Sequence, residues 1–403
     1  MAALEGIRVV ELGLWVAGPA AGGLMADLGA DVIKIESPDG DPMRRFFSLS
    51  TGSKVDRNPP FELDNRGKRS VAIDMNCREG REAVERIISD ADVFVTNMRP
   101  RALEKLGLDA KTLRARYPKL IYAGVTGYGS AGAERDRPGY DVGAFWARTG
   151  IADTLRTGDG PPPAIRGGFG DHITAITTLS GILAALVQRG RTGEGTVVET
   201  SLLRTGMYCI GWDLGIQLEF GKLKRPVARE DNEQPLLNCY RAGDGRWFWL
   251  IGLEAARHFP GVLRAIGKPE LASDERFATV REQRRNRVEL IALLDEMFAR
   301  RPLEEWAERF DAEGVWWAPV QSPAEALADQ QALAAGAVVE VEGMEGGVTR
   351  QVAAPIALAD SGPRGPAPRL GAHTDEVLRE AGLDNGEIEN LRRLGALADE
   401  KDT

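Results

Sequence analysis

The sequence contains few of the residues that bind metals or form disulfides. Its 403 residues include three histidines and three cysteines, and Cys77, Cys209 and Cys239 lie far apart with no C-x-x-C pair. This scarcity and spacing predict no metal site and no disulfide framework. Unpaired cysteines are typical of a reducing compartment, so we expect a cytoplasmic protein.

Long hydrophobic runs and a positive net charge are also lacking. No uncharged apolar run reaches the roughly 18 residues that span a membrane, and the early apolar segment 7–25 contains Glu11, several glycines and Pro19. It therefore predicts neither a signal peptide nor a membrane span. The net charge of −9 argues against nucleic acid or a membrane surface as partner. A phosphate-bearing ligand would require a local basic patch.

The first part of the chain alternates strand and helix patterns. Residues 7–12 predict a strand, 20–28 a helix and 31–36 a second strand, which is a βαβ unit of a parallel sheet. The alternation continues with strands expected at 71–74, 93–97, 120–126 and 195–202. Glu36 at the end of the second strand fits a nicotinamide dinucleotide site, but Gly13 and Gly18 do not form G-x-G-x-x-G, so this alternative is weaker.

Composition changes in the second half of the chain divide it into domains. Residues 1–220 predict a large α/β domain, the charged stretch 221–233 with Pro226 a linker, and 234–330 a smaller α+β domain. Residues 331–403 predict a return linker and the C-terminal part of the large domain. Aromatic side chains of the small domain are expected in its core, namely Trp247, Phe248, Trp249, Trp316 and Trp317.

A glycine-rich turn leads through Asp171 into an apolar helix. Gly167, Gly168 and Gly170 permit turn conformations and close approach to a ligand. Asp171 lies near the expected helix start, so it is either an N-cap or a carboxylate nucleophile in a tight pocket. The local sequence leaves these two interpretations open.

Two groups of cations flank predicted strands. They are Arg66, Lys68 and Arg69 before strand 71–74, and Arg99, Arg101 and Lys105 after strand 93–97. Each group is either a solvated turn or part of a phosphate clamp, because Arg and Lys at a strand end reach several phosphate oxygens. Together they predict a basic patch for an anionic ligand with several phosphates.

Several stretches, taken together and in order, resemble the family III CoA-transferases. They are 18–36, 65–75, 91–97, Gly139-Tyr-Asp141, Gly170-Asp171 and 370–378. This family includes formyl-CoA:oxalate and carnitine CoA-transferases, and α-methylacyl-CoA racemase shares its fold. The resemblance covers nearly the whole chain and is more specific than any single motif.

The resemblance implies a fold and a reaction. The fold is a Rossmann-like large domain formed by both chain ends, with a smaller α+β domain, in an interlocked homodimer. The reaction moves CoA between two carboxylic acids: an aspartate at the position of Asp171 attacks an acyl-CoA to give a mixed anhydride, then carries CoA as a thioester. Acyl-CoA and a free acid are the implied partners, and no tightly bound cofactor is implied.

The resemblance also implies a CoA site. The matching positions are Val16, Ala17, Ile73, Asp74, Met75, Asn97, Met98, Arg99, Lys105, Arg137, Gly139 and Tyr140. The chain has Val16 where the formyl-CoA enzyme has glutamine, and Ser37 where relatives have arginine, so formyl or oxalyl specificity is not expected. Arg44, Arg45 and Arg66 are candidates to replace that arginine at the adenosine phosphate.

The racemase is the alternative function, and Tyr140 distinguishes the two. Racemases of this group have Gly-His-Asp where this chain has Gly139-Tyr140-Asp141. A phenol is a poor base at neutral pH, which favours the transferase. The three histidines do not replace the missing base, and His172 in particular is expected to point away from Asp171. Tyr140 is therefore predicted as a catalytic-site residue beside Asp171.

Overall fold

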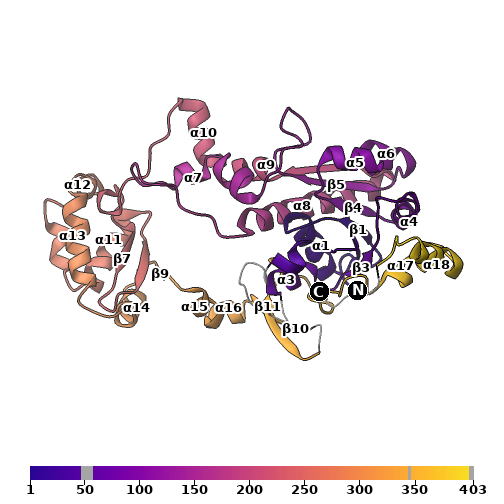
Figure 1. Cartoon of the computed structure of the whole chain (residues 1–403). Coiled ribbons are helices and arrows are strands. Elements are labelled where there is room, and N and C mark those ends of the chain that lie inside the picture. The colour runs from indigo at the N-terminus through magenta and orange to yellow at the C-terminus, as the bar shows by residue number, and fades with distance from the viewer. Residues whose placement is uncertain (47–57, 344–345, 399–403) are drawn as a thin grey trace. The chain divides into compact units, whose positions relative to one another are not determined.

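The computed structural model describes residues 1–46, 58–343 and 346–398. The chain divides into two compact units (Figure 1). The first comprises residues 1–153, 163–223 and 331–403, and the second 154–162 and 224–330. Segment 154–162, which the sequence placed in the large domain, groups with the second unit.

The first unit is built on a six-stranded parallel sheet in the order β3-β2-β1-β4-β5-β6. Its strands are β1 Arg8–Leu12, β2 Asp31–Glu36, β3 Arg69–Ala72, β4 Val93–Thr96, β5 Ile121–Thr126 and β6 Val197–Ser201. The α/β class predicted from the alternating pattern is confirmed. The strand order reverses between β1 and β4, and open parallel sheets bind ligands at the carboxyl ends of strands at such a point.

Helices cover both faces of this sheet. In chain order the helices of the first unit are α1 Ala17–Asp27, α3 Pro59–Asn65, α4 Arg78–Ser89, α5 Pro100–Leu106, α6 Ala110–Arg116, α7 Ile151–Thr154, α8 Phe169–Thr192, α9 Leu202–Cys209, α10 Gly211–Phe220, α17 Thr374–Glu380 and α18 Asn385–Arg393. Of these, α10 has no buried residue and does not cover the sheet. Adjacent strand residues point to opposite faces. Val9 packs with Met25 of α1 and Leu179 of α8, whereas Val10 packs with Val84 of α4.

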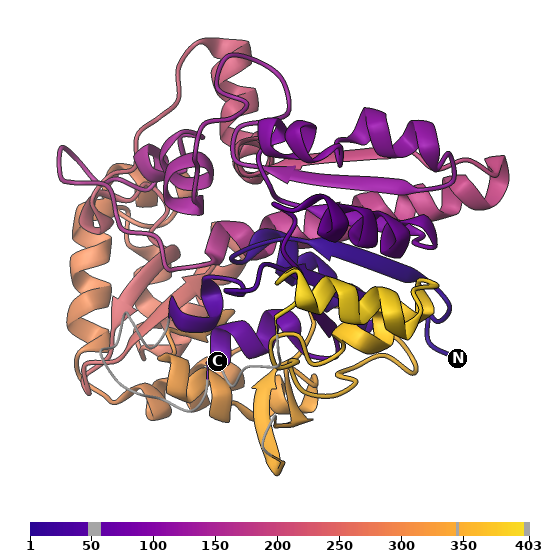
Figure 2. The same ribbon diagram turned by 45° about the vertical axis from the view of Figure 1, so that its right-hand side comes forward.

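The C-terminal helices complete a core that begins at the N-terminus. Leu378 of α17 and Leu391 of α18 belong to the same buried cluster as Ile33 of β2 and Val71 of β3. Figure 2 shows these helices in yellow beside indigo and purple elements from the start of the chain. Before them lies an antiparallel hairpin of β10 Val338–Glu342 and β11 Val348–Val352, preceded by α16 Gln330–Ala334.

Helix α8 is long and apolar enough to cross a membrane by length and composition alone. Its residues Ala175, Leu179 and Ile182 are buried against α1 and the sheet. The ionisable residue Asp171 lies in the first turn of α8. These contacts make α8 a core helix of the first unit.

The second unit has an antiparallel sheet in the order β7-β8-β9. Its elements are β7 Leu237–Arg241, β8 Trp247–Ile251, α11 Ala255–Ala265, α12 Val280–Arg285, α13 Arg287–Phe298, α14 Leu303–Ala312, β9 Trp317–Pro319 and α15 Pro323–Ala328. Phe248 is buried, but Trp247, Trp249 and Trp316 are exposed and Trp317 is half-buried. The predicted aromatic core is therefore wrong for the three exposed tryptophans. Trp247 and Trp249 lie on the outer face of β8, because successive side chains of a strand alternate between its faces, and Trp316 packs on the His258 ring while it stays half exposed.

Two local predictions differ from the structure. The single helix expected up to residue 220 is two helices, α9 and α10, separated at Ile210. The loop expected over 37–65 ends in helix α3, whose start is capped by Asn58, with Pro59 and Pro60 in its first turn. Residues 47–57 of that predicted loop lie outside the described residues.

Candidate active site at the sheet reversal

The loop after β1 meets the end of β4 at the sheet reversal. Asn97, directly after β4, donates its side-chain amide to the Leu14 carbonyl at 2.6 Å and accepts from the Leu14 N–H at 2.9 Å. A Cβ at Gly18 would lie 3.1 Å from the Asn97 side chain, so α1 begins close against it. Val16 is the N-cap of α1 and Ala17 its first residue. Three predicted CoA-site residues, Val16, Ala17 and Asn97, thus lie together.

The turn before Asp171 needs two of its glycines. Gly168 is the N-cap of α8 with φ of +76°, a left-handed conformation that side chains disfavour. A Cβ at Gly170 would lie 2.6 Å from the ring of Phe145. Asp171 lies in the first helical turn and makes no capping bond, so the N-cap interpretation of Asp171 is wrong.

Asp171 is a largely buried carboxyl group with an unusual proton affinity. Its pKa is raised from 3.8 to about 7, mainly by burial and also by the negative charges of Asp141 and Asp64, although His172 opposes the rise. The Asp141 carboxylate accepts the N–H of Gly170 at 3.3 Å, which places a second carboxylate on the same turn. Near neutral pH the carboxyl group of Asp171 is therefore partly protonated and partly ionised. Such a shifted pKa is common among reactive groups.

His172 is fixed by a carboxylate from another helix. Its Nε2 lies 3.0 Å from Oδ1 of Asp64, a buried residue at the end of α3. This hydrogen bond raises the pKa of His172, although burial opposes it. The sequence reasoning missed Asp64, but Asn58 followed by two prolines is a helix-start signal that would have revealed α3. In the described part of the chain no group of His, Cys, Asp and Glu is arranged to hold a metal ion.

Tyr140 lies against an aromatic residue that sequence reasoning did not single out. Its ring packs edge-on against Trp15, with ring centres 5.6 Å apart, and is otherwise exposed. Trp15 has φ of +65°, which is rare for a bulky residue. Its backbone N–H donates a hydrogen bond to the Asp41 carboxylate at 3.0 Å. Tyr140 thus contacts Trp15 just before α1. The residue after Tyr140, Asp141, leads into a π-helix at Val142–Ala147.

Two of the predicted phosphate-binding cations are inside the protein. Arg66 forms an ion pair with Asp27 at 2.6 Å, and Lys68 forms one with Glu11 at 2.6 Å. Both cations are buried. The interior carboxylates hold them there, because a buried acidic group requires a compensating charge. The structure thus replaces the surface patch predicted at these two residues with internal ion pairs.

The remaining predicted cations do not share one place. Arg69 begins β3 and pairs with Asp31, the first residue of β2, at 2.6 Å, which puts it at the amino edge of the sheet. Arg99 is the N-cap of α5 and Lys105 lies in its last turn, both exposed on the carboxyl side of β4. Arg137 is exposed and ion-paired with the neighbouring Glu134. Arg99, Arg101 and Lys105 are thus the predicted cations that follow the carboxyl end of β4, and all three are exposed.

Glu36 is fully engaged by protein groups. Arg44 donates two hydrogen bonds to it at 2.8 Å, and the Ser70 hydroxyl donates a third at 2.6 Å. Although burial opposes the shift, these partners lower the pKa of Glu36 to about 2. It has no free oxygen for a ribose, which removes the support for a nicotinamide site. Arg45, unlike Arg44, is exposed and donates a hydrogen bond to the backbone carbonyl of Asp39 at 3.1 Å.

The other predicted positions lie along the same edge or in nearby loops. Ile73 follows β3, is buried, and forms a bridge with Leu397. Asp74 and Met75 come next and are half-buried. Gly139 lies close to the Tyr128 ring, since a Cβ there would be 2.7 Å from it.

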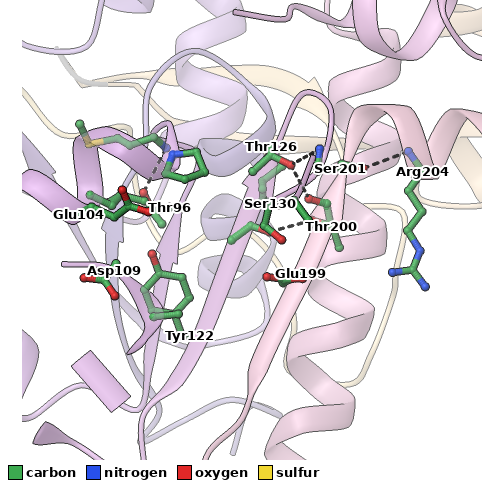
Figure 3. Close-up of a pocket in the computed structure, with 18 residues that line it drawn as sticks. Thr96, Glu104, Asp109, Tyr122, Thr126, Ser130, Glu199, Thr200, Ser201 and Arg204 are labelled. Carbon is green, nitrogen blue, oxygen red and sulfur yellow. Dashed lines mark hydrogen bonds between the residues drawn. The ribbon is translucent and has the colours of Figure 1, made fainter. Parts of the chain in front are cut away.

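A cavity of about 290 Å³ extends over β5 and β6 to their carboxyl ends and to the start of α5 (Figure 3). Met98 is the predicted residue that lines it. Glu104, Asp109 and Tyr122 lie on one side of it, and Thr126, Ser201 and Arg204 on the other. Because carboxylates line one side, this cavity suits an uncharged part of a ligand better than phosphates.

Curated relatives with known reactions match almost the whole chain. The (R)-2-hydroxy-4-methylpentanoate CoA-transferase of Clostridioides difficile is 32% identical over 392 residues, 96% of this chain and 98% of that one. The cinnamoyl-CoA:phenyllactate CoA-transferase of Clostridium sporogenes is 31% identical over 399 residues, 96% of each chain. The succinate–glutarate CoA-transferase of Agrobacterium fabrum is 32% identical, covering 94% of this chain and 95% of that one.

A solved structure of similar fold supports the same assignment. A CAIB/BAIF family protein from Brucella suis has a TM-score of 0.82 and 32% identity, covering 94% of this chain and 99% of that one. Residues 4–374 match CoA-transferase family III. The chain therefore belongs to CoA-transferase family III, whose members use CoA thioesters as substrates.

Proposed function

We propose that Asp171 carries CoA between two carboxylic acids as a covalent nucleophile. The observation that carries the proposal is a largely buried carboxyl group, with a pKa raised to about 7, on a glycine turn. A carboxylate that gives up little hydration when it reacts is a stronger nucleophile than one in water. Its place in the first turn of α8 favours its anionic form through the helix dipole.

In the first half-reaction an oxygen of Asp171 attacks the carbonyl carbon of an acyl-CoA. The C–S bond breaks, CoA leaves as a thiolate, and a mixed anhydride joins Asp171 to the acyl group. The thiolate then attacks the side-chain carbonyl carbon of Asp171, releases the donor acid as a carboxylate, and leaves an aspartyl-CoA thioester. The energy of the thioester is retained at each step, provided that water is excluded.

The second half-reaction is the reverse with a different acid. The acceptor carboxylate attacks the aspartyl-CoA thioester, and the thiolate leaves again. Attack of the thiolate on the acceptor carbonyl then forms the new acyl-CoA and restores the Asp171 carboxylate. Because Asp171 is partly buried on its turn, access of water to it is restricted, and we expect transfer to outpace hydrolysis.

For CoA itself we propose a path along the carboxyl edge of the sheet. Val16, Ala17 and Asn97 would meet the ligand where α1 begins, and Arg99 and Lys105 would face its phosphates as exposed cations on an acidic protein. Arg45 is our candidate for the adenosine phosphate, since Arg44 and Arg66 are committed to internal ion pairs. Arg137 and Met98 would complete the proposed site.

We further propose a homodimer as the working form. Helix α10 has no buried residue, and its Trp212 and Leu218 are 85% and 86% exposed. Tyr208 and Phe220 beside them are also exposed. Apolar surface of this kind is typical of a subunit contact, and a second copy of the chain is the partner that family membership suggests.

The test of the covalent mechanism is capture of the intermediate. We expect hydroxylamine added during turnover to modify Asp171, detected by peptide mapping, and Asp171→Ala to lose at least a thousandfold in transfer while still binding acyl-CoA. The exposed Asp159 provides the matched control variant, Asp159→Ala. Hydroxylamine modification elsewhere, or substantial transfer by Asp171→Ala, would refute the proposal.

The two acids are identified by a panel experiment. The enzyme is incubated with acyl-CoAs and free acids, and new CoA esters are read by mass spectrometry. The panel contains apolar 2-hydroxy acids, aromatic acids and dicarboxylic acids, which are the substrates named for the relatives.

A further inference from the structure

The pair of His172 and Asp64 has no part in the reaction steps above, yet it is built beside the nucleophile. His172 directly follows Asp171 in α8, and Asp64 comes from α3, where it is buried. Their hydrogen bond of 3.0 Å fixes the imidazole. Helix α3 can pack closely against α1 because Gly23 of α1 has no side chain. A Cβ at Gly23 would lie 2.6 Å from the Asp64 carbonyl oxygen.

The imidazole ring lies between the turn of Asp171 and a cavity. A Cβ at Gly168 would be 3.5 Å from Cε1 of His172, so the ring packs against the turn that carries the nucleophile. On another side the ring lines a cavity of about 250 Å³, together with Ala20 of α1 and Ile176 of α8. The histidine is thereby held in place by packing as well as by its hydrogen bond.

Negative side chains outnumber positive ones around Asp171. Asp141 comes from the segment before the π-helix, Asp64 from α3, and His172 from α8 itself. Asp27 and Arg66, which also line the cavity beside His172, form an ion pair with each other. Within the described residues, His172 is therefore the cation that acts on Asp171, against two carboxylates.

We propose that His172, held by Asp64, is a positioning residue that keeps the carboxyl group of Asp171 ionised for attack at neutral pH. The inference rests on the proposed function of Asp171. A positive imidazole one residue away stabilises the carboxylate anion. Asp64 holds the ring in place and favours its charged form, since the hydrogen bond raises the pKa of His172.

Removing the charge of His172 has a defined consequence. In His172→Gln the carboxylates of Asp64 and Asp141 act on Asp171 without compensation, so the pKa of Asp171 rises. Removing Asp64 as well, in His172→Gln/Asp64→Asn, takes away one of these carboxylates and lowers that pKa again. A purely structural role of the pair would instead make the double variant worse than the single one.

The first measurement is the pH dependence of kcat/KM. We expect the acid limb of His172→Gln to move up by about one pH unit, with about fivefold lower kcat/KM at pH 7 and recovery at higher pH. The double variant should recover part of the shift. Ser180→Ala, an exposed position on the same helix, is the matched control and should leave the profile unchanged.

The second measurement does not need turnover. A ¹³C-NMR titration of aspartate carboxyl groups, with the Asp171 signal assigned by its loss in Asp171→Asn, reports the ionisation of Asp171 directly. We expect a higher midpoint in His172→Gln than in the wild type. An unchanged midpoint and an unchanged acid limb would overturn the role of His172. Retention of transfer by Asp171→Ala would instead overturn the proposed nucleophile, so the two failures are distinguishable.

Discussion

The first unit contains two groups of interacting charges: one is fully buried and balanced in sign, and the other is partly exposed and has an excess of carboxyl groups. The balanced cluster is Glu11, Lys34, Asp41 and Lys68, and the Asp171 cluster is Asp64, Asp141, Asp171 and His172. In the balanced cluster Lys34 contacts Glu11 at 2.9 Å and Asp41 at 3.0 Å, and every member has a partner of opposite sign. In the Asp171 cluster one histidine faces three carboxyl groups.

The difference shows that the balance of charges, more than burial, decides what a buried carboxylate does. Burial alone would raise the pKa of Glu11, but Lys34 and Lys68 outweigh it and hold that pKa below its ordinary value. Asp171 lacks such compensation, and its pKa rises to about 7. A balanced cluster fixes structure, whereas an excess of one sign leaves a reactive group.

The largest expected effect comes from breaking the balanced cluster. Lys34→Met removes the ion-pair partner of buried Asp41 and leaves Glu11 with Lys68 alone, so we expect the free energy of unfolding to fall by about 3–5 kcal/mol. Urea unfolding at pH 7 measures it. The exposed Lys105→Met, as control, should change stability by less than about 0.5 kcal/mol. A loss below about 1 kcal/mol in Lys34→Met would show that the cluster is not needed for the fold.

Removing the charge of Asp171 from its cluster should instead stabilise the protein. The folded-state pKa of about 7 exceeds the unfolded value of 3.8, so the folded state binds this proton more tightly and stability is lost as pH rises between these values. Asp171→Asn removes that loss. We expect a gain of about 1–3 kcal/mol at pH 8 and almost none at pH 4, measured by urea unfolding at both pH values. An equal gain at both would contradict the assigned cause.

The next prediction concerns exposed cations. A ligand can reach them, whereas Lys34 and Lys68 are buried in ion pairs. Arg99→Ala and Lys105→Ala should each raise the KM for acyl-CoA up to about tenfold without loss of stability, and the wild-type KM should rise with salt. Steady-state kinetics at two ionic strengths measures both effects. Lys111→Ala, also exposed, is the control. A KM insensitive to salt and to both substitutions would make these cations a solvated surface.

The smallest effect is expected at Tyr140, which directly precedes Asp141 of the Asp171 cluster in the sequence. Tyr140→Phe keeps the packing on Trp15 and should slow transfer only about two- to threefold, on the order of the loss of one hydrogen bond. In D₂O the wild type should take up no deuterium at the α-carbon of a 2-methylacyl-CoA without an acceptor acid, as ¹H-NMR would show. Rapid exchange would favour the racemase instead.

Much of the fold, and the residue proposed as nucleophile, could be predicted from the sequence. Apolar runs of strand length separated by helical patterns predict a parallel sheet, because both faces of such strands are buried. The glycine turn before Asp171 and the motifs from residue 18 to 378 point to the family and to this residue. Helix α3 was missed although Asn58 and two prolines signal its start, and the break between α9 and α10 was missed because Ile210 is no typical capping residue.

The partners of the charged groups were decided only by the tertiary structure. Lys68 meets Glu11 across 57 residues, and His172 meets Asp64 across 108. The sequence states the charge of each side chain, but Coulomb interactions depend on the distance between charges and on the surrounding dielectric. Both are set when helices α1, α3 and α8 pack together, which is why Arg66 and Lys68 became interior ion pairs while Asp171 was left without a compensating cation of equal strength.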